Sequence, residues 1–244
     1  MKALLLDFGG VLVQTSKRPS WAAELAKEVH QRLARAGFAG LAAEEIEVDI
    51  RAGADADRYW KDAMSRLAAP VEMTHRGFWG DFVAADWPQA ARELVRAEAS
   101  ALCRRMGELR QERVVRPGMR ELLERCQVPV AVVSNALCGA VHRDFLAAAG
   151  VEVALQVYSD EVGVRKPNPE MIWIATRALG VDPSRVWYVG DNYDRDGLCG
   201  VRAGVGTTVI MRSDSTDTIP YRVRQRPSAV VEDAAGLLRL MEAS

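Results

Sequence analysis

Residues 3–10 read Ala-Leu-Leu-Leu-Asp-Phe-Gly-Gly, a short apolar run that is closed by a carboxylate and followed by two glycines. A continuous apolar run of this length, bounded by glycine, predicts a buried strand that ends in a glycine loop. Asp7 therefore stands at the carboxyl end of the first predicted strand.

The pattern of residues 3–10 returns in the second half of the chain, after Arg116-Pro117-Gly118. Short apolar runs occupy 130–133, 155–158, 186–189, 207–211 and 229–231. Helical patterns separate or follow them near 138–149, 168–179, 194–203 and 233–242. Alternation of this kind predicts an α/β fold, a doubly wound parallel sheet with helices on both faces.

A different composition fills the stretch from about residue 20 to residue 111. It is rich in Ala, Glu, Arg and Leu at helical spacing and contains no convincing strand. Breaks such as Ala69-Pro70 and Trp87-Pro88 divide it into about four helices. We therefore expect an α/β core formed by residues 1–15 and 115–244, with a helical domain inserted at 16–114.

Composition excludes several classes of function. The chain has 244 residues, 49% of them apolar and 27% charged, and its formal net charge is −1. This balance gives no indication of a nucleic-acid partner or an anionic membrane partner. The four cysteines form no Cys-x-x-Cys pair, and the sequence has neither a signal-peptide core nor a membrane span. These features predict a cytoplasmic protein.

Four polar signals coincide with the ends of predicted strands. They are Asp7, then Ser134-Asn135 after the run 130–133, then Lys166 in a loop before a helix, and finally Gly190-Asp191 with Asp196 five residues beyond Asp191. Each signal alone is typical of a helix cap or a turn. Because ligands of open parallel sheets bind at the carboxyl ends of the strands, the four together predict one site.

These signals make the sequence resemble the haloacid dehalogenase (HAD) superfamily, in particular its subfamily I phosphatase-like hydrolases with a C1 cap. All four motifs of that family occur in order, and the most specific are Lys166-Pro167-Asn168-Pro169-Glu170 and Trp187-Tyr188-Val189-Gly190-Asp191. The resemblance implies a Rossmann-like core, an α-helical cap at 16–114, and a hydrolase that acts on a small phosphorylated substrate.

The family's chemistry implies a role for each motif residue. Asp7 would be the nucleophile and would form an aspartyl-phosphate. Ser134 and Lys166 would hold the phosphoryl oxygens, with help from Asn135. The implied cofactor is Mg²⁺, whose ligands would be Asp7, the backbone carbonyl of Gly9 and Asp191. Asp196 would be a further ligand or would orient a metal-bound water.

One position departs from the family pattern. Phosphatases of this family usually carry a second aspartate two residues after the nucleophile, as general acid and base, and this chain has Gly9 there. General acid–base catalysis contributes about 10²–10⁴-fold to the rate. Another group could take the role, with Asp194 or a cap residue as candidates; the leaving group could need no proton; or the site could have lost turnover.

Two alternatives to a phosphohydrolase remain on the sequence alone. A 2-haloacid dehalogenase also lacks the acid at this position, because halide leaves without a proton, but it needs no metal and usually lacks the Gly-Asp of the fourth motif. A catalytically weak binding or regulatory protein is the other. The cap cluster Arg58, Tyr59 and Trp60 could contact a substrate or pack within a helix. Nothing in the sequence indicates an oligomeric state.

Overall fold

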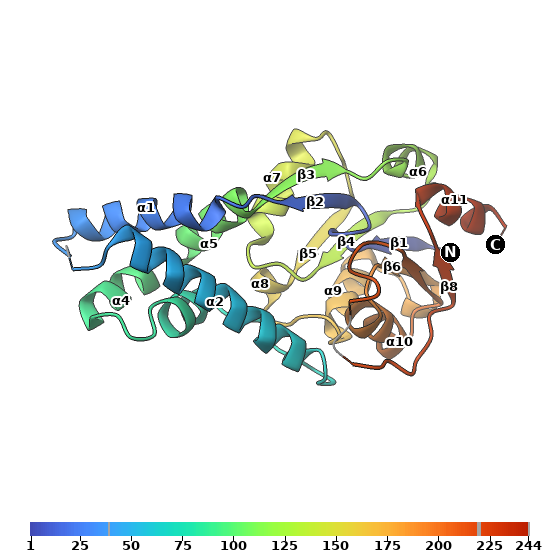
Figure 1. Ribbon diagram of the computed structural model, residues 1–244. Helices are drawn as coiled ribbons and strands as arrows, with labels where there is room; N and C mark the ends of the chain where they lie inside the picture. Colours follow the sequence, from blue (N-terminus) through green and yellow to red (C-terminus); the bar gives the residue numbers. More distant parts are fainter. Residues whose placement is uncertain (39, 219–220, 244) are drawn as a thin grey trace. The chain divides into compact units, whose positions relative to one another are not determined.

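The computed structural model describes residues 1–38, 40–218 and 221–243 (Figure 1). Its internal contacts divide the chain into two compact units. The first unit contains Met1–Thr15, Met64–Glu72 and Arg113–Ser244, and the second contains Ser16–Ala63 and Met73–Glu112. Along the sequence, the second unit therefore interrupts the first twice, on either side of a nine-residue segment.

The first unit is built on a six-stranded parallel sheet with the order β5-β4-β1-β6-β7-β8. The strands are β1 (Ala3–Leu6), β4 (Val130–Ser134), β5 (Leu155–Tyr158), β6 (Val186–Gly190), β7 (Thr207–Met211) and β8 (Ala229–Val231). From β1 the chain builds outward through β4 and β5 and then returns to the other side through β6. The strand order thus reverses beside β1, which is where open α/β sheets place their ligands. The predicted doubly wound sheet is confirmed.

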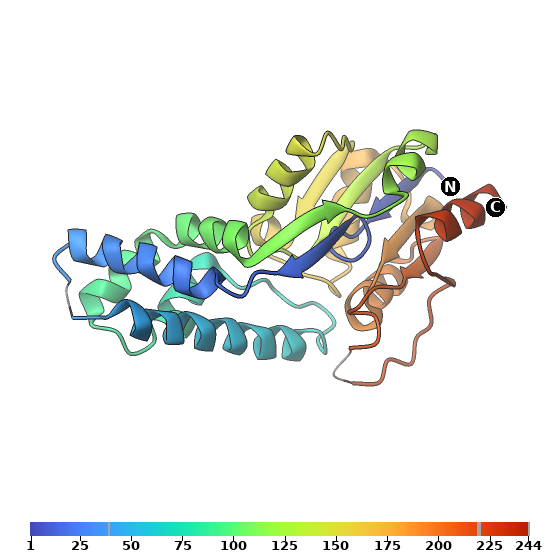
Figure 2. The same ribbon diagram turned by 45° about the horizontal axis from the view of Figure 1, so that its top comes forward.

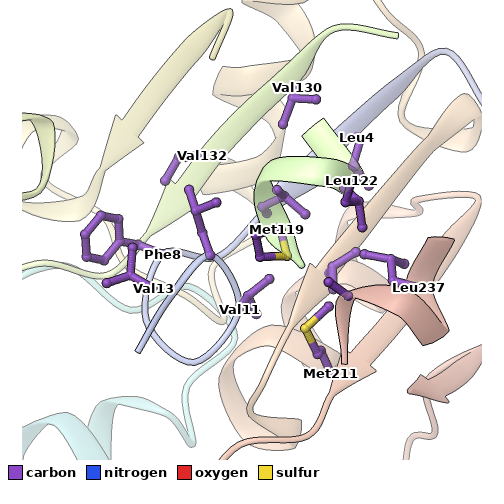
Figure 3. Close-up of a cluster of buried hydrophobic side chains, with 14 of the residues drawn as sticks. Leu4, Phe8, Val11, Val13, Met119, Leu122, Val130, Val132, Met211 and Leu237 are labelled. Atoms are coloured by element: carbon purple, nitrogen blue, oxygen red, sulfur yellow. The ribbon is translucent and has the colours of Figure 1, made fainter. Parts of the chain in front are cut away.

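Helices cover both faces of this sheet because its strands are apolar on both sides. Leu4 and Leu6 pack with side chains of α6 (Met119–Arg125), α7 (Gly139–Ala148) and α11 (Ala234–Glu242), as Figure 3 shows for several of them. Ala3 and Leu5 point to the opposite face and pack with α9 (Glu170–Leu179) and α10 (Leu198–Ala203). Three short helical turns, α8 (Ser159–Val162), η2 (Pro183–Arg185) and η3 (Tyr193–Gly197), complete the unit.

The second unit is helical, as its sequence predicts (Figure 2). Its elements are α1 (Trp21–Arg35), α2 (Ala43–Met64), α3 (His75–Gly77), η1 (Phe78–Val83), α4 (Gln89–Ala97) and α5 (Ala99–Arg110). Leu25, Val29 and Leu33 repeat every four residues along α1 and are fully buried. Ion pairs such as Arg105 with Glu28 join α1 and α5 at the surface of the unit.

Two strands of a separate two-stranded sheet were not expected from the sequence. They are β2 (Val13–Lys17) and β3 (Gln111–Val115), and they carry the chain between the two units. Four of the five β2 side chains are exposed, so the strand lacks the apolar alternation that would identify it. None of the helices in the described part of the chain is both long and apolar enough to cross a bilayer.

A histidine packs against the residue that follows Asp7. The His142 ring stacks on Phe8 with 3.9 Å between ring centroids and 3° between ring planes. Its Nδ1 atom is shielded from solvent and has no hydrogen-bond partner among the residues described. Burial, reinforced by the charge of Arg113, lowers the pKa of His142 to about 3. The ring is therefore neutral in the folded protein at any ordinary pH.

This pKa predicts an acid-sensitive stability. The unfolded chain takes up a proton on His142 near its ordinary pKa of about 6.5, whereas the folded protein does not until about pH 3. Between these values the unfolded state binds more protons, so the free energy of unfolding falls as pH falls. Between pH 7 and pH 5, the free energy of unfolding measured with urea should fall by about 2 kcal/mol less in His142→Phe than in wild type.

A histidine of the helical unit, His30, provides the control for this experiment. His30 Nδ1–H donates a hydrogen bond to the Leu41 carbonyl at 2.8 Å, and His30 lies outside the sheet unit. His30→Gln is the matched substitution, since it removes one histidine without altering the sheet unit. If the free energy of unfolding fell equally with pH in wild type and in His142→Phe, the result would contradict a buried, neutral ring.

Candidate active site

Asp7 is held at the centre of the sheet edge where β1 ends. Its backbone N–H donates a hydrogen bond to the Val189 carbonyl on β6 at 2.8 Å, which fixes the turn out of β1. The residue as a whole is 8% exposed. Gly10, three residues later, has φ of +75°, and a Cβ atom there would overlap Asp191 Oδ2. Glycine is therefore required for the loop to pass this close to Asp191.

Lys166 brings two of the predicted motifs together. It lies in the loop before α9 and is 2% exposed. Its Nζ lies 2.7 Å from Asp7 Oδ1 and 2.6 Å from Asp196 Oδ1, and it donates to the Val133 carbonyl at 3.2 Å. Burial opposes the charge on Lys166, but Asp196 and Asp7 outweigh it and raise the pKa. The lysine is therefore a permanent cation between two carboxylates.

Asp7, Asp191 and Asp196 form a compact acidic group. Each offers one carboxylate oxygen, and these oxygens lie within 4.8 Å of one another. Burial, with the charges of Asp196 and Asp7, raises the pKa of Asp191 to about 6. Burial likewise raises the pKa of Asp7, in part offset by Lys166. Burial opposes ionisation of Asp196, but Lys166, with Tyr188 and Arg195, outweighs it, and the pKa of Asp196 falls.

The chemistry of this donor set fits a divalent cation. Three buried carboxylates face one lysine, so the ionised group carries excess negative charge in a region of low dielectric. An all-oxygen set of this size is what Mg²⁺ takes in proteins, with water completing its shell. The three carboxylates among the predicted metal ligands, Asp7, Asp191 and Asp196, thus lie together.

Ser134 and Asn135 follow β4 and meet the same site. Ser134 is 3% exposed, and its hydroxyl favours the ionised form of Asp7 and so lowers the pKa of that carboxyl. The Asn135 side chain makes two hydrogen bonds with the Lys166 backbone. The Lys166 N–H donates to Asn135 Oδ1 at 2.7 Å, and Asn135 Nδ2 donates to the Lys166 carbonyl at 3.1 Å. The Asn135 side chain therefore fixes the Lys166 loop to the end of β4.

Gly9 leaves open space where a side chain would stand. A Cβ atom built at Gly9 has no neighbouring heavy atom within 4 Å, and its φ lies outside the left-handed region. Asp194, the sequence's candidate for the missing acid, is elsewhere engaged: Ser65 hydrogen-bonds its side chain, and Arg195 Nε lies 3.8 Å from Asp194 Oδ1. Among the described residues, Asp194 is not part of the acidic group whose carboxylate oxygens lie within 4.8 Å of one another.

Several residues of the site were missed by the sequence analysis. Ser213 and Ser215 both donate to Asp191 Oδ2, the former at 2.6 Å. Tyr188 on β6 is fully buried and donates to Asp196 Oδ1 at 2.6 Å. The two serines hold one oxygen of Asp191, so its orientation is fixed and its other oxygen is left for a ligand.

Arg116 is the fourth residue that the sequence analysis missed. It is 8% exposed and donates to the carbonyls of Gly10, Arg212 (2.7 Å) and Glu232 (2.8 Å). These carbonyls belong to the loops that follow β1, β7 and β8. One buried guanidinium therefore joins three loops at the edge of the sheet that carries Asp7 and Asp191.

The aromatic and basic cluster of α2 is more exposed. The Arg58 guanidinium lies over the Tyr59 ring, 4.3 Å from its centroid, and Tyr59 is 64% exposed. The neighbouring Lys61 pairs with the buried Asp57 at 2.6 Å. These contacts are all local to α2, and they leave both interpretations of the cluster open.

Comparison with known proteins identifies a family of hydrolases. Residues 1–204 match the sequence profile of the haloacid dehalogenase-like hydrolases. A glyceraldehyde 3-phosphate phosphatase from Methanopyrus kandleri is 45% identical over 82 residues, which are 34% of this chain and 35% of that protein. The matched stretch thus spans about a third of the length of this curated relative.

Solved structures extend the likeness over the whole chain. A 2-haloacid dehalogenase from Pseudomonas syringae pv. Tomato has a TM-score of 0.61 at 19% identity, covering 100% of this chain and 99% of its own. A HAD phosphatase from Thermococcus onnurineus has a TM-score of 0.60 at 16% identity, covering 99% and 98%. At such identities the likeness shows the fold, and it does not choose between the two chemistries.

Proposed function

Because the chain belongs to the haloacid dehalogenase-like hydrolase family, we propose that it is a magnesium-dependent phosphohydrolase of small phosphorylated metabolites. The observation that carries the proposal is the buried group of Asp7, Asp191 and Asp196, with ligand oxygens within 4.8 Å of one another. A dehalogenase needs no metal, so its reaction does not account for a buried group of three carboxylates. The name of the partial relative, a phosphatase, supports the same chemistry.

Asp7 is the proposed nucleophile. One oxygen of its carboxylate attacks phosphorus, the bond from phosphorus to the leaving oxygen breaks, and the leaving group departs with the bonding electrons. Attack of water on the aspartyl-phosphate then releases phosphate and restores the Asp7 carboxylate. Lys166 and Ser134 stabilise the negative charge of the phosphoryl oxygens, since both already contact Asp7.

The proposed magnesium ligands are Asp7, the Gly9 carbonyl, Asp191 and Asp196. When bound, the ion supplies positive charge that offsets the carboxylates and the phosphoryl group. Ser213 and Ser215 orient Asp191 by holding its Oδ2 atom. Lys166 and Tyr188 hold Asp196 Oδ1, and the backbone N–H groups of Asp191 and Asn192 hold Oδ2 at 3.2 and 3.1 Å.

The preferred substrates follow from the missing carboxyl group at Gly9. A leaving alkoxide needs a proton, whereas the carboxylate that leaves an acyl phosphate and the phenolate that leaves a nitrophenyl ester do not. The contacts of Asp194 with Ser65 and Arg195 make it a poor proton carrier for Asp7. We therefore propose that the enzyme is most efficient on phosphates with a stable leaving group.

Turnover of acetyl phosphate and p-nitrophenyl phosphate tests this function. With Mg²⁺ we expect phosphate release, and with EDTA we expect a loss of about 10²-fold or more, since the metal offsets much of the transition-state charge. Chloride release from 2-chloropropionate, measured in parallel without metal, tests the dehalogenase alternative that Gly9 favours. Folded, magnesium-binding protein that turns over none of the three compounds would indicate a binding role.

A further inference from the structure

Residues 64–72, here called the strap, lie in the sheet unit although the helices before and after them belong largely to the second unit. Three side chains of the sheet unit hold the strap's carbonyls. Tyr221 OH donates to Ser65 at 2.7 Å, Arg202 Nη1 to Leu67 at 2.8 Å, and Asn168 Nδ2 to Pro70 at 3.2 Å. The strap is therefore anchored along most of its length.

The end of the strap pairs with the loop that carries Lys166. Val71 and Val164 form an antiparallel β-bridge. The Glu72 N–H donates to the Gly163 carbonyl at 3.0 Å, and the Arg165 N–H donates to the Pro70 carbonyl at 3.4 Å. Backbone on both sides of the bridge is thereby engaged, up to the residue directly before Lys166.

A buried ion pair reinforces this pairing. Arg165 is 1% exposed and Glu72 is 9% exposed, and Arg165 Nη1 lies 3.2 Å from Glu72 Oε1. The Ser159 hydroxyl donates to the other oxygen, Glu72 Oε2. Burying a charge away from water is unfavourable unless an opposite charge lies beside it. Arrangements that keep Glu72 and Arg165 buried but apart are therefore disfavoured. The pair thus selects one position of the strap against the loop.

We propose that the strap positions Lys166 for phosphoryl binding, with Glu72 and Arg165 as positioning residues that act through the loop backbone. The proposal rests on the proposed function, which gives Lys166 its phosphoryl-binding role. The Lys166 side chain must reach both Asp7 and Asp196, and a misplacement of about 1 Å in such a site can lower the rate by about 10²-fold. Asn135 holds the Lys166 backbone from the β4 side, and the strap holds the same loop from the other.

Two variants separate positioning from simple stabilisation. Glu72→Gln keeps the shape of the side chain and leaves Arg165 buried beside a neutral amide. Glu72→Gln/Arg165→Met removes both charges, so it leaves no unpaired charge and is expected to fold even if the single variant does not. The matched control is Glu161→Gln on the adjacent α8, which breaks an exposed ion pair between Glu161 and Arg143 of α7.

Three readouts are compared on the full chain: kcat and KM for p-nitrophenyl phosphate with Mg²⁺, inhibition by orthovanadate, and hydrogen exchange of the amides of residues 162–166 and 168. For the double variant we expect kcat and orthovanadate affinity to fall about 10- to 100-fold, with faster exchange in this loop. Glu161→Gln should match wild type. A folded double variant with wild-type kcat, orthovanadate affinity and exchange would overturn the proposal.

The activity of wild type, compared with that of the double variant, distinguishes this proposal from the proposed function. If wild type neither turns over phosphate esters nor binds orthovanadate, the phosphohydrolase function is wrong, and with it the phosphoryl-binding role of Lys166. Active wild type combined with a double variant that only melts earlier, with unchanged kcat, would leave the enzyme intact and reduce the Glu72–Arg165 pair to a stabilising contact.

Discussion

Replacement of Asp7 by asparagine is expected to lower turnover of p-nitrophenyl phosphate by about 10³-fold or more. The amide keeps the size of the carboxylate but cannot form the acyl phosphate bond. It should also leave stability unchanged or improved at neutral pH. Burial raises the pKa of Asp7, so its ionised form is unfavourable in the folded protein, and the neutral amide removes that penalty.

The measurement combines kcat with thermal unfolding. Asp182→Asn is a matched control, because Asp182 caps η2 through Ser184 and takes no part in the site. Wild type, but not Asp7→Asn, should acquire a hydroxylamine-sensitive phosphate label from acetyl phosphate. Turnover in Asp7→Asn within tenfold of wild type, with normal unfolding, would exclude Asp7 as the nucleophile.

The strands of the sheet could be predicted because each is a continuous apolar run between turn signals. Val130–Ser134 and Val186–Gly190 are buried at every position, and no surface requirement interrupts their composition. β2 gave no such signal, because only Val13 of its five residues is buried. Its strand conformation comes from pairing with β3, nearly a hundred residues away, which no local pattern records.

The motif residues of the site could be predicted for the same reason: parallel strands place their carboxyl ends together. Asp7 and Asp191 each follow a predicted strand, and the structure brings them within ligand distance. The family resemblance inferred from these motifs is confirmed by the match over residues 1–204. The roles assigned to the individual residues, and the cap boundaries at 16 and 114, stay predictions.

The residues that hold the motif side chains or their loops in place could not be predicted from strand ends or from local sequence patterns. Ser213 and Ser215 belong to a polar stretch that is typical of an exposed loop, and only the path of the chain after β7 brings them to Asp191. Glu72 belongs to a segment that continues into helices on both sides, yet it pairs with Arg165 in the sheet unit. Long-range hydrogen bonds of this kind depend on tertiary structure and leave no periodicity in the sequence.

Gly9→Asp is expected to raise the turnover of alkyl phosphates such as glyceraldehyde 3-phosphate by about 10²-fold, within the range of general acid catalysis. The site has room for the new side chain, since no heavy atom lies within 4 Å of the position of its Cβ, and φ suits any residue. An aspartic acid there could protonate the leaving alkoxide. Acetyl phosphate, whose leaving carboxylate needs no proton, should gain less than about threefold.

An acid at residue 9 would be revealed by the difference between the rate gains on the two substrates, rather than by either rate alone. Gly9→Asn fills the same space without a transferable proton, so it should leave both substrates near the wild-type rate. Gly10→Asp, one residue on, should not be tolerated, because a Cβ there overlaps Asp191 and φ is +75°. An equal gain on both substrates, or an equal gain with Gly9→Asn, would mean that another group already supplies the proton and that Gly9 does not restrict the leaving group.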